Sequence, residues 1–170
     1  MPTSTDAIVM LRDDHKEMRR VFREFERAKN ATPSQQRRLV TKLMKLLTEH
    51  TYIENEVMYP RVRKLVPDLE DDILESYEEH HVADLLIKEL AVTRPDDERF
   101  RAKAMVLIEN VRHHMDEEEN QWFPQVREAL GRNQLQELGA AMKQARKNAP
   151  APPEPSAFQK AVDAVFAAKD

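Results

Sequence analysis

Apolar residues recur every three or four positions over most of the chain, which is the spacing of one buried helix face. The first such stretch has Ile8, Leu11, Met18 and Phe22 in register, with charged residues between them. Four further stretches keep the same period. The helices predicted from this spacing cover residues 6–29, 33–59, 67–92, 95–123 and 134–147.

Prolines and capping residues mark where these helices begin and end. Thr32 precedes Pro33 and lies three residues before Gln35, which is the pattern of a capping box with proline in the first turn. Pro60 and Pro124 fall at the ends of the second and fourth helices. We expect each proline to end or bend its helix, with a shorter helical piece following it.

Composition favours an all-α fold and excludes several classes of protein. The 170 residues include 2 glycines and no cysteine, so neither a turn-rich β fold nor a disulfide or thiolate metal site is expected. No apolar run approaches the ~18 residues of a membrane span. The first residues lack the pattern of a signal peptide, so we expect a cytoplasmic protein. A net charge of −4 argues against nucleic acid as a partner.

The histidines follow an internal repeat. Its motif is a histidine, a glutamate four residues later, and an aromatic residue followed by proline at the ninth and tenth positions. The two copies are His50-x3-Glu54 with Tyr59-Pro60, and His114-x3-Glu118 with Phe123-Pro124. The preceding helices match as well, because Asp14-His15 aligns with Glu79-His80. The chain therefore contains two copies of a helix pair, roughly 1–66 and 67–130.

Two helix pairs predict an antiparallel four-helix bundle with a pseudo-two-fold axis. Residues four apart share a helix face, so the histidine and glutamate of each motif project together. The repeat would gather four imidazoles and two carboxylates near the middle of the bundle, where they require compensation. Such ligands suit two ions of iron, manganese or zinc. The predicted ligands are His15, His50, Glu54, His80, His114 and Glu118.

Over about residues 6–130 these motifs resemble the hemerythrin HHE cation-binding family. The resemblance implies a hemerythrin-like bundle with a non-haem di-iron centre, completed by a bridging oxo, hydroxo or water ligand. An open coordination position would bind dioxygen, peroxide or nitric oxide. The implied ligands are His15 and His50 for one iron, His80 and His114 for the other, and Glu54 and Glu118 as bridges.

Two positions depart from the oxygen-carrying members of that family. Those members have a fifth histidine four residues after the third-helix ligand, where this chain has Asp84. Their second bridging carboxylate is an aspartate five residues after its histidine, whereas Glu118 follows His114 by four. An anionic or aqueous ligand in place of an imidazole favours ferric iron. The resemblance therefore implies peroxide or redox chemistry, or iron sensing, rather than reversible oxygen carriage.

Four residues adjoin the predicted ligands. Asp84 is expected either as a ligand or as a hydrogen-bond acceptor beside the centre, and Tyr77 as a core residue whose hydroxyl could reach it. His81 and His113 are rotated by about 100° from their neighbouring ligands. We expect them beside the centre or at the surface, and the glutamates flanking Glu118 in solvent.

The pattern predicts three parts: a bundle at 1–130, an additional helix at 131–148, and a Pro-rich linker with a short amphipathic helix at 149–170. We expect the last segment to dock on the bundle, with a second copy of the chain or another protein as the alternative. The leading functional hypothesis is catalase-like decomposition of H2O2 in oxidative-stress defence. The alternatives are O2, NO or iron binding without turnover, and a metal-free bundle with structural histidines.

Overall fold

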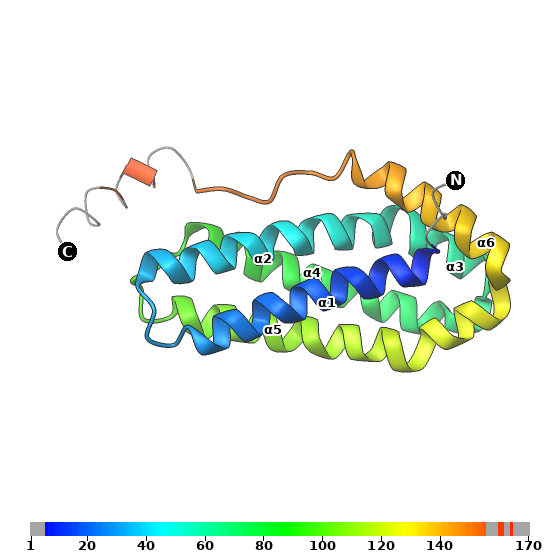
Figure 1. Cartoon of the computed structure of the whole chain (residues 1–170), viewed down its shortest axis with the longest axis horizontal. Coiled ribbons are helices and arrows are strands. Elements are labelled where there is room, and N and C mark those ends of the chain that lie inside the picture. Colours follow the sequence, from blue (N-terminus) through cyan, green and yellow to red (C-terminus); the bar gives the residue numbers. More distant parts are fainter. Residues whose placement is uncertain (1–5, 156–159, 162–163, 165–170) are drawn as a thin grey trace.

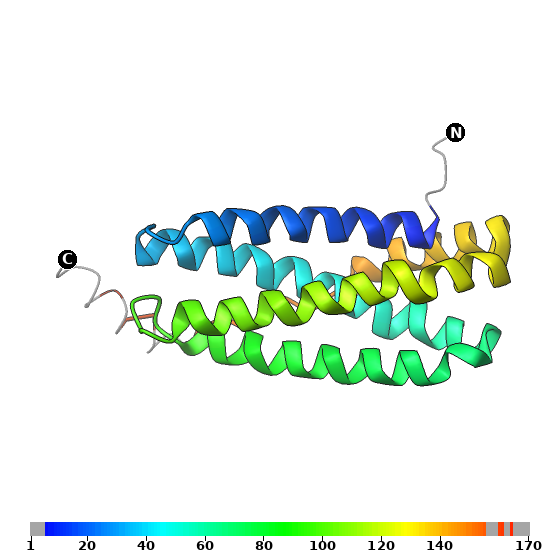
Figure 2. The same cartoon turned by 90° about the horizontal axis from the view of Figure 1, so that it is seen from below.

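Four long helices run antiparallel and side by side in the computed structural model, which describes residues 6–155, 160–161 and 164 (Figures 1 and 2). The described residues contain no β-strand, so the predicted all-α fold and up-down bundle are confirmed. The elements are α1 (Ala7–Arg27), α2 (Pro33–Ile53), η1 (Glu54–Met58), α3 (Tyr59–Leu65), η2 (Pro67–Leu69), α4 (Glu70–Val92), α5 (Phe100–Glu117), η3 (Glu118–Trp122) and α6 (Phe123–Arg146).

Side-chain capping explains the starts of α1 and α2. The Asp6 side chain accepts from the Val9 amide at 2.9 Å, and Thr32 and Gln35 form the predicted capping box ahead of α2. The predicted start of the fourth helix at residue 95 is wrong, because α5 begins at Phe100. Residues 93–99 form a turn instead, in which the Asp97 carboxylate accepts from the Arg99 amide at 2.8 Å.

A π-helical turn precedes each of the two prolines that end the repeat motif. In η1 the Tyr59 amide donates to the Glu54 carbonyl, and in η3 the Phe123 amide donates to the Glu118 carbonyl, both five residues back. A proline has no N–H and its ring crowds the carbonyl four residues before it, so the wider turn accommodates it. Each π turn begins at a predicted bridging glutamate, and the chain stays helical through the proline instead of ending there.

Two apolar clusters fill the bundle, and the predicted ligands lie between them. One cluster contains Met18 and Leu47 and the other contains Leu11 and Ile53, so His15 and His50 fall between the two in the sequence. The same holds for the histidine of α4 and for Glu118, which follows α5. The bundle therefore has a polar layer between two closely packed apolar ends.

The second half of α6, after Gly131, lies outside the four-helix bundle. Gly131 has a φ of +68°, and this left-handed residue kinks α6 so that its second half turns back along α1 and α2 (Figure 1). Buried Leu135, Leu138 and Met142 join the apolar cluster of the bundle. The linker at 149–155 has no regular structure.

The predicted C-terminal helix and its docking lie outside the described residues, apart from helical residues 160, 161 and 164. Within the part of the chain that is described, no helix is both long and apolar enough to span a membrane.

Candidate metal centre

The six predicted ligands form a single buried layer across the bundle. Each of α1, α2, α4 and α5 provides one histidine, and η1 and η3 each provide the first residue of a π turn as a glutamate. All six side chains lie in the core, and the two glutamates have no exposed surface. The residues of the layer are His15, His50, Glu54, His80, His114 and Glu118.

The histidines form two pairs whose Nε2 atoms face each other. The distance between these atoms is 3.2 Å for His15 and His50, and 3.0 Å for His80 and His114. In both pairs the ring planes are steeply inclined to one another. Two nitrogen lone pairs directed at a common point are the arrangement of two ligands of one metal ion.

Each glutamate lies between the two histidine pairs. Oε2 of Glu54 is 3.2 Å from Nε2 of His50 and 3.4 Å from Nε2 of His80. Glu118 also reaches both pairs, but with a different oxygen for each, because Oε2 is 3.2 Å from Nε2 of His15 and Oε1 is 3.5 Å from Nε2 of His114. Both carboxylates therefore occupy positions from which they could bridge two ions.

A second set of acceptors orients the four imidazoles from outside the layer. Each accepts a hydrogen bond from an Nδ1–H, so that the inward Nε2 is the nitrogen available to a metal. The pairs are His50 with Asp14 at 3.1 Å, His114 with Glu79 at 2.6 Å, His80 with Asn55 at 2.8 Å and His15 with Glu119 at 2.7 Å. Glu119 was expected in solvent, and that expectation is wrong.

These acceptors obey the sequence repeat. Asp14 and Glu79 immediately precede the first histidine of each half, and each orients the second histidine of the same half. Asn55 and Glu119 immediately follow the bridging glutamates, and each orients a histidine of the opposite half. The repeat alignment was the signal that could have identified all four from the sequence.

The donor set of the layer fits a pair of metal ions. Both oxygens of Glu54 and Oε2 of Glu118 are buried and accept no hydrogen bond. A buried carboxylate without donors requires a cation close by. The combination of imidazole nitrogen and carboxylate oxygen suits iron, manganese and zinc, so the residues present fit the predicted centre.

Without a metal, protons supply the positive charge of the layer. Burial lowers the pKa of His50, but Glu54 and Asp14 outweigh it and raise that pKa to about 10. Burial likewise lowers the pKa of His114, and Glu118 and its outer acceptor raise it to about 9. Burial raises the pKa of Glu54, and the adjacent histidines bring it well below its usual range. Protons on these imidazoles would compete with a metal for the same nitrogens.

Tyr59 adds a hydroxyl that sequence reasoning missed. Its Oη donates to Oε1 of Glu118 at 3.0 Å and lies 3.2 Å from Nε2 of His80. Burial and the nearby carboxylates raise its pKa well above 10, so the hydroxyl keeps its proton. The equivalent residue in the other half is Phe123, which stacks on His15 with ring centres 5.9 Å apart. The two histidine pairs therefore differ by one polar group.

The four additional candidates lie around this layer rather than in it. Asp84 is exposed because Ala83, one position earlier, faces the core, so the structure does not bring Asp84 to the ligands. His81 and His113 are exposed, and His113 pairs with a surface glutamate at 3.2 Å. The Tyr77 hydroxyl donates to the backbone carbonyl of Asn55 at 3.4 Å. The Tyr77 ring packs edge-on against the ring of Tyr59, whose hydroxyl does reach the layer.

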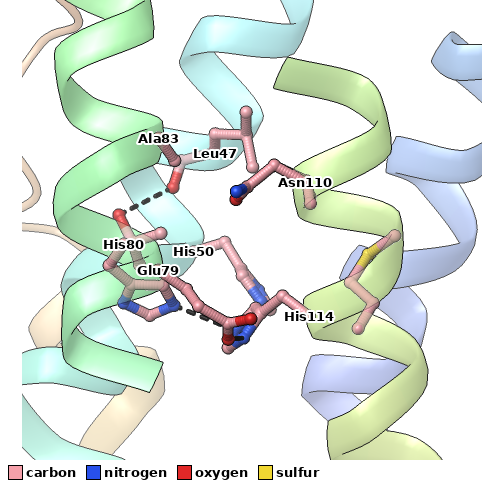
Figure 3. Close-up of a pocket in the computed structure, with 10 residues that line it drawn as sticks. Leu47, His50, Glu79, His80, Ala83, Asn110 and His114 are labelled. Carbon is pink, nitrogen blue, oxygen red and sulfur yellow. Dashed lines mark hydrogen bonds and ion pairs between the residues drawn. The ribbon is translucent and has the colours of Figure 1, made fainter. Parts of the chain in front are cut away.

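A small cavity of about 10 Å³ adjoins the histidines. Figure 3 shows His50, His80 and His114 with Leu47 and Ala83 around it. This volume is at the lower limit of what one water molecule needs. Apolar side chains line one side of the cavity, and the histidines of the layer line the other.

Comparison with known proteins gives one family and two relatives. The family model described as "Hemerythrin HHE cation binding domain" matches residues 6–126. A Nostoc protein named DNA nickase is 27% identical over 137 residues, which are 81% of this chain and 38% of that protein. The chain thus spans well under half the length of this curated relative.

A crystal structure gives an independent view of the fold. It is that of a hemerythrin HHE cation-binding domain-containing protein from Mycobacterium kansasii, and it superimposes with a TM-score of 0.70. The identity is 22%, and the match covers 85% of this chain and 89% of the other. At this identity the likeness shows that the two bundles share a fold.

Proposed function

The chain belongs to the hemerythrin HHE cation-binding family, and we propose that its polar layer holds two iron ions that decompose hydrogen peroxide. The observation that carries the proposal is the balance of donors and acceptors in the layer. Four Nε2 atoms and two carboxylates converge there, with buried carboxylate oxygens that accept no hydrogen bond. A cluster of this kind is suited to cations and unsuited to an apolar core.

The ligands divide between two positions in this proposal. His15 and His50 would hold one ion, His80 and His114 the other, and the two glutamates would contact both. When bound, the two ions would supply the electron transfer by which one peroxide is oxidised to O2 and a second is reduced to water. The balanced reaction is 2 H2O2 → 2 H2O + O2.

The protein's own groups orient ligands and control protons. The outer acceptors fix the direction of each imidazole, and the apolar clusters on either side keep bulk water from the layer. Tyr59 holds a proton at Oη, hydrogen-bonded to Glu118 and within 3.2 Å of Nε2 of His80. It is thus the group placed to donate a hydrogen bond to an oxygen atom entering there.

The test is oxygen evolution from peroxide by iron-loaded protein, followed with an oxygen electrode against matched free iron. We expect turnover by the natural chain and by His113→Gln, a control at an exposed histidine. The Glu54→Gln variant should lose iron and turnover together. If the natural chain binds two irons and evolves no more oxygen than free iron, the proposed activity is wrong.

Binding without turnover is the second candidate, and the apolar cavity favours it. Leu47, Ala83 and Val111 form an apolar lining beside the histidines, and an apolar lining favours a small uncharged molecule such as O2 or NO over an ion. In that case iron-loaded protein would bind one of these gases stoichiometrically, as seen by a spectral change, while leaving peroxide intact.

We favour a small substrate over DNA, although the Nostoc relative is named a DNA nickase. The chain carries a net charge of −4, and carboxylates crowd a surface cavity beside α5, where they would repel phosphates. The acidic residues of that cavity are Asp72, Glu75, Glu79 and Glu117. Relaxation of supercoiled plasmid by iron-loaded protein, absent in Glu54→Gln, would support the DNA alternative instead.

A further inference from the structure

The two histidine pairs are supported differently from outside. Arginines donate hydrogen bonds to both carboxylates that orient His15 and His50. The groups that orient the other pair are the Asn55 amide and the Glu79 carboxylate. Among the described residues, no arginine or lysine lies at ion-pair distance from Glu79. The supported chains are His15–Glu119–Arg19 and His50–Asp14–Arg146.

Arg146 is the unexpected member, because it comes from outside the bundle. It is the last residue of α6, twenty residues beyond the region matched by the family model. Both of its terminal nitrogens donate to the Asp14 carboxylate, with Nη1 at 2.9 Å from Oδ1. The same Oδ2 that accepts from Nη2 accepts from Nδ1 of His50 at 3.1 Å. A continuous chain of hydrogen bonds thus joins the outer helix to a predicted ligand.

We propose that Arg146 is a positioning residue for the metal held by His15 and His50, an inference that rests on the proposed metal centre. The Asp14 side chain is 20% exposed, so water competes for its oxygens. A bidentate guanidinium fixes the plane of a carboxylate in a way that a single donor does not. Fixing Asp14 fixes the Nδ1–H bond of His50 and keeps its Nε2 directed into the layer.

The docking of α6 makes this support possible. Gly131 turns the helix back, and Leu138 and Met142 bury it against the bundle. Because linkage is reciprocal, a metal that binds better when α6 is docked must also stabilise the docked helix. Metal loading should therefore slow hydrogen exchange in residues 135–146 more than a purely local ligand change would.

The experiment titrates the full-length metal-free chain with Co²⁺, following the visible absorbance and competing with a chromophoric chelator. The natural chain should bind two ions. In Arg146→Gln the affinity for one ion should stay unchanged. The affinity for the ion held by His15 and His50 should fall by about 10–100-fold, the usual effect of losing a hydrogen-bond partner of a ligand. Arg146→Lys should fall between the two.

Two comparisons separate positioning from general destabilisation. Arg127→Gln breaks the other ion pair between α6 and α1, that of Arg127 with Asp6 at 3.4 Å, and should leave both affinities unchanged. Asp14→Asn should lower the affinity for the same single ion, and adding Arg146→Gln to that variant should lower this affinity no further. If Arg146→Gln binds both ions as tightly as the natural chain does, or if it lowers both affinities equally, the inference is overturned. If the natural chain binds no Co²⁺, the metal centre itself is refuted.

Discussion

Metal loading should release about two protons per chain at pH 7. In the metal-free layer His50 and His114 have pKa values of about 10 and about 9. Both imidazoles are therefore almost fully protonated at neutral pH. A metal requires the Nε2 lone pair, so each ion displaces one proton, while Glu54, whose pKa lies well below its usual range, releases none.

The same pKa values set the pH dependence of affinity. Since one proton competes with each ion below about pH 9, the apparent affinity should rise about tenfold per pH unit for each metal between pH 6 and 8. The proton count follows from isothermal titration with Co²⁺ in buffers of different ionisation enthalpy. His113→Gln alters an exposed histidine and should leave the count at two.

Other proton counts would have a different meaning. A count of three would indicate that the Tyr59 hydroxyl also loses its proton, and Tyr59→Phe would return the count to two. Full loading with no proton release and no change in affinity between pH 6 and 8 would refute the charge balance derived for the layer.

Three further predictions follow from individual contacts. Tyr59→Phe removes the hydroxyl donor beside His80 but keeps the ring, so peroxide turnover per bound iron should fall at least tenfold, measured with the oxygen electrode. Gly131→Ala should destabilise the fold by about 1–3 kcal/mol in urea denaturation. The reason is the backbone, with φ +68° and ψ 178° in a region that essentially only glycine adopts, because a Cβ would meet no atom within 4 Å. An unchanged midpoint would contradict this reasoning. His50 has a folded pKa of about 10, above the ~6.5 of an unfolded chain. Its contribution to the stability of the metal-free chain is therefore complete below about pH 6.5 and is lost as the pH rises through about 10, so urea midpoints should fall over that range, and less so in His50→Gln.

The sequence was sufficient for the bundle and for the six inward residues because both follow from the repeat. Helix spacing placed His50 and Glu54 on one face, and the second copy of the motif implied the two-fold arrangement. The family and the all-α fold are confirmed. The structure brings the six residues together, while metal binding stays a prediction.

Other features depend on geometry that the sequence pattern does not contain. The π turn after Glu54 places one more residue in the turn than an α-helix would, and the hydroxyl of Tyr59 reaches the layer there, where the prediction considered Tyr77. Asp84 was judged from its spacing alone, and the burial of Ala83 shows that the neighbouring position faces the core. A four-residue offset on a helix does not by itself decide which side chain points inward.

Long-range pairs were also beyond the sequence. Arg146 meets Asp14 across 132 positions of the chain, and the kink at Gly131 makes this contact possible. Glu119 contacts His15 across 104 positions, so it is half-buried although its sequence neighbours suggested a solvated run. Such contacts depend on how the helices pack, which periodicity does not define.

The central claim is a paired metal site, and elemental analysis of the full chain, purified without a metal-affinity step, tests it most directly. We predict about two irons per chain, falling sharply in Glu54→Gln and staying at two in His113→Gln. Protein that contains no metal and takes up none from excess Fe²⁺ under anaerobic conditions would contradict the account.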